Sequence, residues 1–250
     1  ISAGATAMAA TLSSGGVLYY IAAGSSGLMA AADAMELGGT FDIPSDQIRI
    51  LMAGGLPTSA DMPGDTEDDV ESLEASLSKL TNKDAVIAVS ASGTTPYTIA
   101  AARIALAKGA TLIGIANNAN SALLNLSHHA ILLETPPEVL SGSTRMGAGT
   151  SQKITLNMLS TLMAIKLGHI YDGMMVNLRA DNAKLRSRAE GIVCAVVNVS
   201  EYEAKKALQT ADGNVKLAIL LAGGCPDPID AKKILDDSKG NVRNALKALG

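Results

Sequence analysis

Residues 85–96 have the sequence AVIAVSASGTTP, and this stretch decides the fold. Its first five residues are apolar without alternation, which is typical of a strand buried on both faces of a sheet. The small hydroxyl residues and the glycine that follow form a turn, and Pro96 suits the first turn of a helix. A buried strand that leads through a polar turn into a helix is one βα unit of a parallel sheet.

The same alternation recurs along the chain. Short apolar runs at 17–23, 48–54, 110–116 and 130–134 are separated from one another by helical patterns. Because right-handed crossovers between parallel strands place helices on both faces, we predict a three-layer α/β/α sandwich with a mainly parallel five-stranded sheet. The helices are predicted at 27–37, 67–79, 96–108, 121–126, 151–167 and 176–197.

The C-terminal tail contains an internal repeat. The sequence AKKAL at 204–208 recurs 27 residues later as AKKIL at 231–235, and each copy is followed by GNV. Each unit is a helix, a Gly-Asn turn and a second helix, which predicts a small four-helix module. We therefore predict two domains, a sheet domain at 1–197 and a helical domain at 198–250.

The composition excludes several classes of protein. The net charge of −4 and the 5 tyrosines and 1 phenylalanine argue against nucleic-acid binding. No apolar run reaches the roughly 18 residues of a membrane span and no leader is visible, so we expect no membrane partner and a cytoplasmic location. The cysteines and histidines lack metal-ligand spacing. Because Ile1 already lies in a helical pattern, we expect a further N-terminal segment to precede it.

Two loops follow neighbouring strands of the predicted sheet, at the edge where parallel sheets bind ligands. Residues 23–27 (AGSSG) and 90–96 each open a helix with small hydroxyl residues and backbone N–H groups, which together suit a phosphate monoester. Plain turns and helix caps explain either loop alone. Because two such loops follow adjacent strands, a phosphate site explains them as well as plain turns and helix caps do. The candidate ligands are Ser25, Ser26, Ser92, Gly93, Thr94 and Thr95.

Charged residues add further candidates. Residues 141–150 (SGSTRMGAGT) lead into a long helix, and Ser143, Thr144 and Arg145 are candidate contacts to an anionic oxygen. A salt bridge at a helix start is the alternative for Arg145. Glu67 and Glu36 are candidate catalytic acids, although acids in a first helical turn are also ordinary partners of the helix dipole.

Segments spread over about residues 17–190 together resemble the N-acetylmuramic acid 6-phosphate etherase family, a branch of the sugar-isomerase (SIS) domain proteins. The run from Gly142 to Thr161 is the most specific, whereas the Ser-Gly-Thr loops mark only the wider sugar-phosphate fold. The tail resembles the family's small C-terminal helical domain. The matching stretches are AGSSG (23–27), DAME (33–36), AGG (53–55), ED (67–68), ASGTTPY (91–97), GSTRM (142–146), AGTSQK (148–153), LNMLST (156–161) and NAKL (182–185).

The resemblance implies cleavage of the D-lactyl ether of N-acetylmuramic acid 6-phosphate during peptidoglycan recycling, with no metal or organic cofactor. In the family's pattern Glu67 takes the place of the base that removes the C2 proton, and Glu36 that of the acid that assists departure of lactate. The two carboxyl groups then need environments that separate their pKa values. The resemblance assigns the phosphate to Ser26, Ser92 and Thr95, supported by Ser25 and Gly93.

The chain departs from the family pattern at three cations. Leu28 and Thr94 stand where the family usually has Arg, and Gly147 stands where it usually has Lys. The usual Cys-Pro-Pro after the first glutamate is LGG at 37–39. A hydrogen bond to a charged group contributes about 1.5–3 kcal/mol. Affinity for the usual substrate is therefore expected to fall unless other cations compensate, and the candidates are Arg145, Lys153 and Lys184.

Helix geometry predicts that the site is shared between subunits. Glu36 lies ten residues beyond Ser26 along one predicted helix, or about 15 Å at 1.5 Å per residue. That separation is long for a single aminosugar phosphate. Either the helix is broken near Met35, or Glu36 serves the phosphate site of a neighbouring subunit. We predict a homodimer with composite active sites.

Two other functions stay open for the same fold and a small-molecule phosphosugar. A non-catalytic sugar-phosphate-binding regulator is favoured by the three missing cations. An aldose–ketose isomerase is weakened because no histidine follows a glutamate in an obvious catalytic loop. The presence of both Glu36 and Glu67 favours the lyase.

Overall fold

The computed structural model describes residues 1–62, 66, 68 and 70–250. The chain forms two compact units, Ile1–Glu36 with Pro44–Met163 and Leu37–Ile43 with Ala164–Gly250. We predicted the domain boundary at 197–198, but residues 164–197 group with the tail. The reason is that apolar side chains before residue 198, such as Val193, share one hydrophobic core with the helices of the tail.

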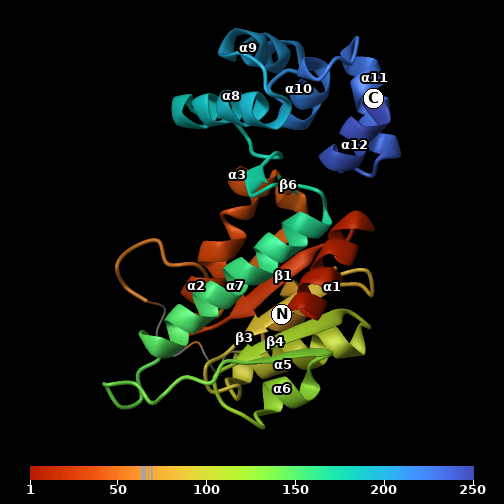
Figure 1. The fold of residues 1–250 in the computed structure, drawn as a ribbon. Helices are drawn as coiled ribbons and strands as arrows, with labels where there is room; N and C mark the ends of the chain where they lie inside the picture. Colours follow the sequence, from red (N-terminus) through yellow and green to blue (C-terminus); the bar gives the residue numbers. More distant parts are fainter. Residues whose placement is uncertain (63–65, 67, 69) are drawn as a thin grey trace. The chain divides into compact units, whose positions relative to one another are not determined.

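A five-stranded sheet forms the centre of the first unit (Figure 1). Its order is β2-β1-β3-β4-β5 and every neighbouring pair is parallel, which confirms the predicted fold class. All residues of the central strands β1 and β3 are buried, as their unbroken apolar sequences indicated. The strands are β1 Leu18–Ala22, β2 Ile48–Met52, β3 Ala85–Val89, β4 Thr111–Ala116 and β5 His129–Leu132.

Helices cover both faces of this sheet, as the three-layer prediction requires. On one face Val86 belongs to a core shared with α4, α5 and α6. On the other face Tyr20 contacts Asp33 of α2, and Gly4 of α1 lies against Leu159 of α7. The helices are α1 Ser2–Ser13, α2 Gly24–Ala34, η1 Ser45–Gln47, α4 Leu73–Ser76, α5 Pro96–Ala107, α6 Ala122–Leu126 and α7 Gly147–Lys166, whose last residues belong to the second unit.

Two predicted helices differ from those observed in the first unit. Of the helix predicted at 67–79, the described residues contain only the short α4 at Leu73–Ser76. The helix predicted at 27–37 ends at Ala34 instead. There the N–H of Glu36 bonds to the carbonyl of Asp33 at 3.1 Å, three residues back, so the last turn tightens and the α-helix ends.

A two-stranded hairpin in the second unit precedes the segment predicted as a helix at 176–197, and the helix itself begins seven residues later than predicted. Strands β6 Ile170–Tyr171 and β7 Met174–Met175 pair antiparallel. Asp172 and Gly173 between them have φ values of 46° and 78°, which is the conformation that tight hairpin turns require. The helix α8 begins only at Ala183, where the Asn182 side chain caps it.

The tail folds as its repeat predicted, into two pairs of short helices. Asn214 and Asn241 occupy equivalent positions of the repeat, and each caps the second helix of its pair through its side chain. No helix among the described residues is long and apolar enough to cross a membrane. The helices of the second unit are α3 Leu37–Phe41, α8 Ala183–Val197, α9 Glu201–Thr210, α10 Val215–Ala222, α11 Pro228–Asp237 and α12 Val242–Leu249.

Candidate functional site

The order of the strands changes direction between β1 and β3. From β1 the chain passes to β2 on one side and then returns to β3 on the other side. Ala22 and Val89 pair at the ends of these two strands, so the loops at 23–27 and 90–96 begin side by side. Open parallel sheets bind ligands in the crevice at such a reversal. The expectation that the two candidate phosphate loops follow adjacent strands is confirmed.

A network of hydroxyl groups fixes the second loop. The Ser90 hydroxyl lies 2.8 Å from that of Thr95 and accepts the N–H of Gly93 at 3.0 Å. The Ser92 hydroxyl accepts both the N–H and the hydroxyl of Thr94, at 3.2 and 3.1 Å. Ser90 is buried and lies at the centre of this network, although it was not among the predicted site residues. Its place at the start of the loop, directly after a buried strand, was the signal that could have identified it.

Gly93 lies where no other residue fits. Its φ of +68° belongs to the left-handed region, and a Cβ atom there would lie 2.2 Å from the Ser121 hydroxyl oxygen. The Gly93 carbonyl accepts the N–H of Leu123 at 2.9 Å, which ties the loop to α6. The loop is therefore held in one conformation before any ligand arrives, which lowers the cost of ordering it on binding.

Both loops end at helix N-termini without a side-chain cap. Ala23 is the N-cap of α2 and Thr95 is the N-cap of α5, and neither helix receives a capping bond from its N-cap side chain. The first N–H groups of a helix have no partner within it, and the helix dipole adds partial positive charge there. Ser26 lies buried in the first turn of α2. This arrangement can hold the oxygens of a phosphate group without a cation.

Of the two candidate catalytic acids, the structure describes only Glu36. Glu67 lies outside the described residues. Glu36 lies in the two-residue link between α2 and α3, and its carboxylate forms an ion pair with Lys153 of α7 at 3.4 Å. The Glu36 side chain is 63% exposed, so it is accessible to a ligand.

A third carboxylate, that of Asp33, is buried three residues before Glu36 and was not among the predicted site residues. Asp33 accepts hydrogen bonds from the Tyr20 hydroxyl at 3.0 Å, the Asn157 amide at 2.8 Å and the Ser160 hydroxyl at 2.9 Å. Burial raises the pKa of Asp33, and these hydrogen bonds oppose the shift. The carboxylate joins β1, α2 and α7, and so fixes the end of the helix that leads to Glu36.

The segment before α7 holds the remaining candidates. Ser143, Thr144 and Arg145 lie on the surface or half-buried, and the Ser143 hydroxyl accepts the N–H of Arg145 at 3.4 Å. Within the described part of the chain, Arg145 forms no ion pair with the two loops. The salt bridge considered for Arg145 is thus not observed there, and its contact with an anion stays a prediction.

The first turns of α7 are anchored to the end of β4. The buried Gln152 side chain donates to the Asn117 amide oxygen at 2.8 Å, and Asn117 donates to the Ser151 hydroxyl at 3.1 Å. Asn117 directly follows β4, so these bonds link α7 to the ligand-binding edge of the sheet. Among the described residues no cluster of three or more His, Cys, Asp or Glu side chains could hold a metal ion.

Comparisons with known proteins place the chain among similar sequences. Residues 59–167 match the SIS domain family. An N-acetylmuramic acid 6-phosphate etherase from Streptomyces avermitilis is 41% identical over 250 residues, which cover 99% of this chain and 80% of that protein. The corresponding etherase from Bacillus subtilis is 37% identical over 235 residues, covering 93% of this chain and 77% of that protein.

Solved structures show the same fold at lower sequence identity. A protein from Bacteroides fragilis superposes with a TM-score of 0.54 at 19% identity, covering 68% of this chain and 81% of that chain. An E. coli CFT073 protein in complex with A5P superposes with a TM-score of 0.51 at 15% identity, covering 68% and 78%. These two likenesses concern the fold alone.

Proposed function

Because the chain belongs to the N-acetylmuramic acid 6-phosphate etherase family, we propose that it cleaves the D-lactyl ether of N-acetylmuramic acid 6-phosphate. The products are N-acetylglucosamine 6-phosphate and D-lactate, so the protein is a carbon–oxygen lyase. The observation that carries the proposal is the 41% identity to an etherase over 99% of the chain.

The crevice between β1 and β3 is the proposed place of the phosphate group. The free N–H groups at the starts of α2 and α5 would bind its oxygens, and Ser26, Ser92 and Thr95 would add hydroxyl donors. Hydroxyls that bond to one another in the loop, as Ser90 and Thr95 do, can turn their hydrogens toward the arriving oxygens. Lys153 is the described cation beside Glu36, and we assign it to the negative charge of the substrate.

The proposed chemistry needs one base and one acid. The sugar opens to its aldehyde, which makes the C2 proton acidic. Glu67 takes that proton, a C2–C3 double bond forms as the C3–O bond to lactate breaks, and Glu36 gives its proton to the departing oxygen. Water then adds its hydroxyl group to C3 and its proton to C2.

We propose that two copies of the chain share each site. The helix α2 ends at Ala34, as the alternative of a break near Met35 required. Even so, the nine helical residues from Ser26 to Ala34 span about 12 Å, which still separates Glu36 from the phosphate loop of its own chain. The two helices joined through Asp33 also carry exposed large apolar side chains: Leu28 on α2, Met35 directly after it, and Ile154 and Met158 on α7. An exposed apolar surface of this kind marks a contact with another protein surface, and a second copy would bring its Glu36 to this site.

Release of D-lactate from N-acetylmuramic acid 6-phosphate tests the activity directly. We expect release by the natural chain and loss of it in Glu67→Gln. Glu74 is an exposed acid on α4, seven residues further along the chain, and Glu74→Gln should be as active as the natural chain. In heavy-oxygen water the label should enter at C3. Tight phosphosugar binding without lactate would instead support the regulator, and conversion of an aldose to a ketose would support the isomerase.

Subunit mixing tests the shared site. Glu36→Ala and Glu67→Ala should each be inactive alone, and exchange of subunits between them should restore part of the activity. In such a mixed pair one site has both acids only if they come from different chains. No recovery after verified exchange would refute the composite site but not the activity.

A further inference from the structure

The chain passes from one compact unit to the other directly after the proposed catalytic acid. Glu36 ends the first stretch of the first unit, and Leu37 begins the stretch 37–43 of the second unit. The helix α3 starts at Leu37 itself. Whatever fixes residues 37–43 therefore also fixes the backbone on the C-terminal side of Glu36.

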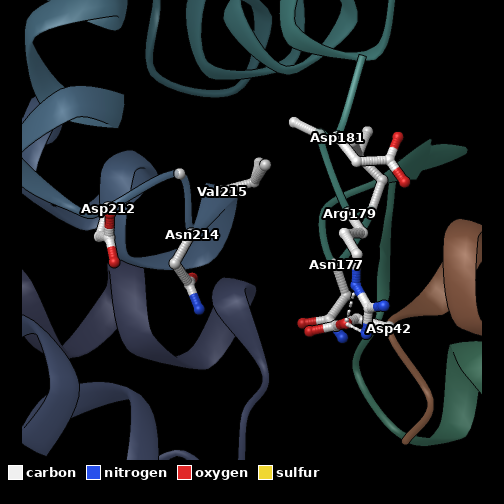
Figure 2. A pocket seen from close by; sticks show the side chains of 10 residues that line it. Asp42, Asn177, Arg179, Asp181, Asp212, Asn214 and Val215 are labelled. Carbon is white, nitrogen blue, oxygen red and sulfur yellow. Dashed lines mark hydrogen bonds and ion pairs between the residues drawn. The ribbon is translucent and has the colours of Figure 1, made fainter. Parts of the chain in front are cut away.

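Asn177 and Arg179, which follow the β6–β7 hairpin, hold this stretch in place (Figure 2). The Arg179 guanidinium donates two hydrogen bonds to one carboxylate oxygen of Asp42, from Nε at 3.1 Å and from Nη2 at 2.7 Å. The Asn177 amide donates to the carbonyl of Phe41 at 2.7 Å, and the backbone N–H of Arg179 donates to the carbonyl of Gly39 at 3.2 Å. We call Asn177, Arg179 and Asp42 the 177–179 clamp.

The helix α3 depends on such external bonds. It has five residues, and two of them are Gly38 and Gly39. A helix this short is not stable by itself in water, and each glycine disfavours the helix by roughly 1 kcal/mol relative to alanine. The bonds of the clamp meet the second half of α3 and the residue after it, and so they supply the order that the local sequence lacks.

Among the residues that the structure describes, Lys153 is the polar partner of the Glu36 side chain. Its ion pair with Lys153 spans 3.4 Å, and the two side chains are 63% and 30% exposed. Exposed ion pairs of this kind contribute little free energy. The carboxyl group therefore depends mainly on its own backbone, which follows directly from the end of α2 and continues directly into α3.

We infer that Arg179 is a positioning residue for Glu36, which through Asp42 keeps the acid where it can protonate the departing oxygen. The inference rests on the proposed etherase function and goes beyond it by assigning a role in the reaction to the second unit. Arg179 itself does not contact the substrate. It acts on the reaction only through the stretch 37–43.

The surroundings of the clamp make the test practicable. Arg179 and Asp42 line a cavity of about 300 Å³ rather than the packed core, and Asp212 and Asn214 lie across it (Figure 2). The Arg179 and Asp42 side chains are 57% and 49% exposed. Removal of the Arg179 side chain therefore leaves the apolar core intact, and the variant is expected to fold.

The experiment compares Arg179→Ala with Arg243→Ala. Arg243 forms an equally exposed ion pair, with Asp172 in the same unit, and so it is a matched control that does not touch residues 37–43. In the lactate assay we expect kcat of Arg179→Ala to fall about tenfold with KM within twofold of the natural value, because a misplaced acid costs only transition-state stabilisation. Arg243→Ala should keep both values, and Arg179→Lys should restore part of kcat.

A second experiment distinguishes a positioning role of Arg179 from a general loss of structure in the variant. In a Glu36→Gln background Arg179→Ala should cause no further loss of kcat, because the group through which it acts is already gone. Hydrogen exchange of residues 37–43 should accelerate in Arg179→Ala and not in Arg243→Ala. An unchanged kcat, an additive loss in the Glu36→Gln background or unchanged exchange would each overturn the inference while leaving the etherase activity standing. Absence of lactate release by the natural chain would overturn the proposed function, and the inference with it.

Discussion

Acid is expected to destabilise the second unit through one half-buried histidine. His169 precedes β6, and its pKa is lowered to about 4, first by burial and next by the Lys216 ammonium, against the opposing effects of the Phe41 carbonyl and Asp42. In the unfolded chain the same ring titrates near 6.5. Between these two values the unfolded state binds a proton that the folded state does not. Stability is therefore fully present above pH 6.5 and is lost as the pH falls toward 4.

The size of this effect follows from the two pKa values. From pH 7 to pH 5 the unfolded histidine becomes almost fully charged while the folded one stays neutral, which removes about 2 kcal/mol of stability. Lys216 does not alter the slope in this range, because its own pKa, lowered by burial to about 8, keeps it charged throughout. The substitution His169→Gln removes the titrating group, so the variant should lack this loss even if it is less stable at pH 7.

The measurement is urea unfolding at pH 7 and pH 5, with hydrogen exchange of α10 to report on the second unit by itself. The natural chain should lose about 2 kcal/mol more than His169→Gln between the two pH values. His129→Gln is the control, because His129 lies on the edge strand β5 of the first unit. Equal losses in the natural chain and in His169→Gln would refute the assignment of the acid sensitivity to this ring.

Three further substitutions test the first unit. Thr94→Arg should lower KM for the phosphosugar about tenfold or more in the lactate assay, since a bond to a charged group contributes about 1.5–3 kcal/mol; an unchanged KM would contradict the phosphate assignment of the loop. Gly93→Ala should destabilise the fold by about 2–4 kcal/mol in urea, because its Cβ would lie 2.2 Å from the Ser121 oxygen at a φ of +68°. Asp33→Ala should cost about 3 kcal/mol by leaving the Tyr20, Asn157 and Ser160 donors without their acceptor, whereas a native-like urea midpoint would show that water replaces it.

The sheet could be predicted from the sequence because its signal is local. A run such as AVIAV at 85–89 is apolar throughout, and only a strand buried on both faces accommodates five such residues between a turn and a helix. The observed strands begin and end within two residues of the predicted runs. The tail was predictable for the same reason, since each Gly-Asn pair provides both a turn and the cap of the next helix.

The hairpin at 170–175 was missed although its signal was present. Asp-Gly between apolar residues favours a tight hairpin turn, and Asp172 and Gly173 adopt the positive φ values that this turn needs. We extended the apolar pattern after it into a helix instead. The true start of α8 is marked by Asn182, a good capping residue whose side chain accepts the N–H of Leu185 at 3.0 Å.

The organising residues of the site could not be predicted, because their roles depend on distant contacts. Asp33 looks like an ordinary polar residue on a helix, and its partners Asn157 and Ser160 lie 124 and 127 residues further along the chain. Ser90 differs from the neighbouring hydroxyl residues only in that the fold buries it. The end of α2 before Glu36 likewise has no local breaker, since glycine first appears at Gly38.

The proposed reaction uses two parts of the protein that differ in rigidity: the phosphate loops and the link that carries Glu36. The phosphate loops are rigid, since hydroxyl bonds and Gly93 fix them at the ends of central strands. Glu36 lies instead in a short link between helices, at the point where the chain leaves one compact unit for the other. Substitutions in the loops should therefore change mainly KM, because the phosphate is held equally in the ground and transition states. Substitutions that loosen the link should change mainly kcat, because the acid is needed only as the C3–O bond breaks. A loop variant that lowered kcat at constant KM would show that the phosphate anchor also positions the reacting carbons, and that the two supports are not separate.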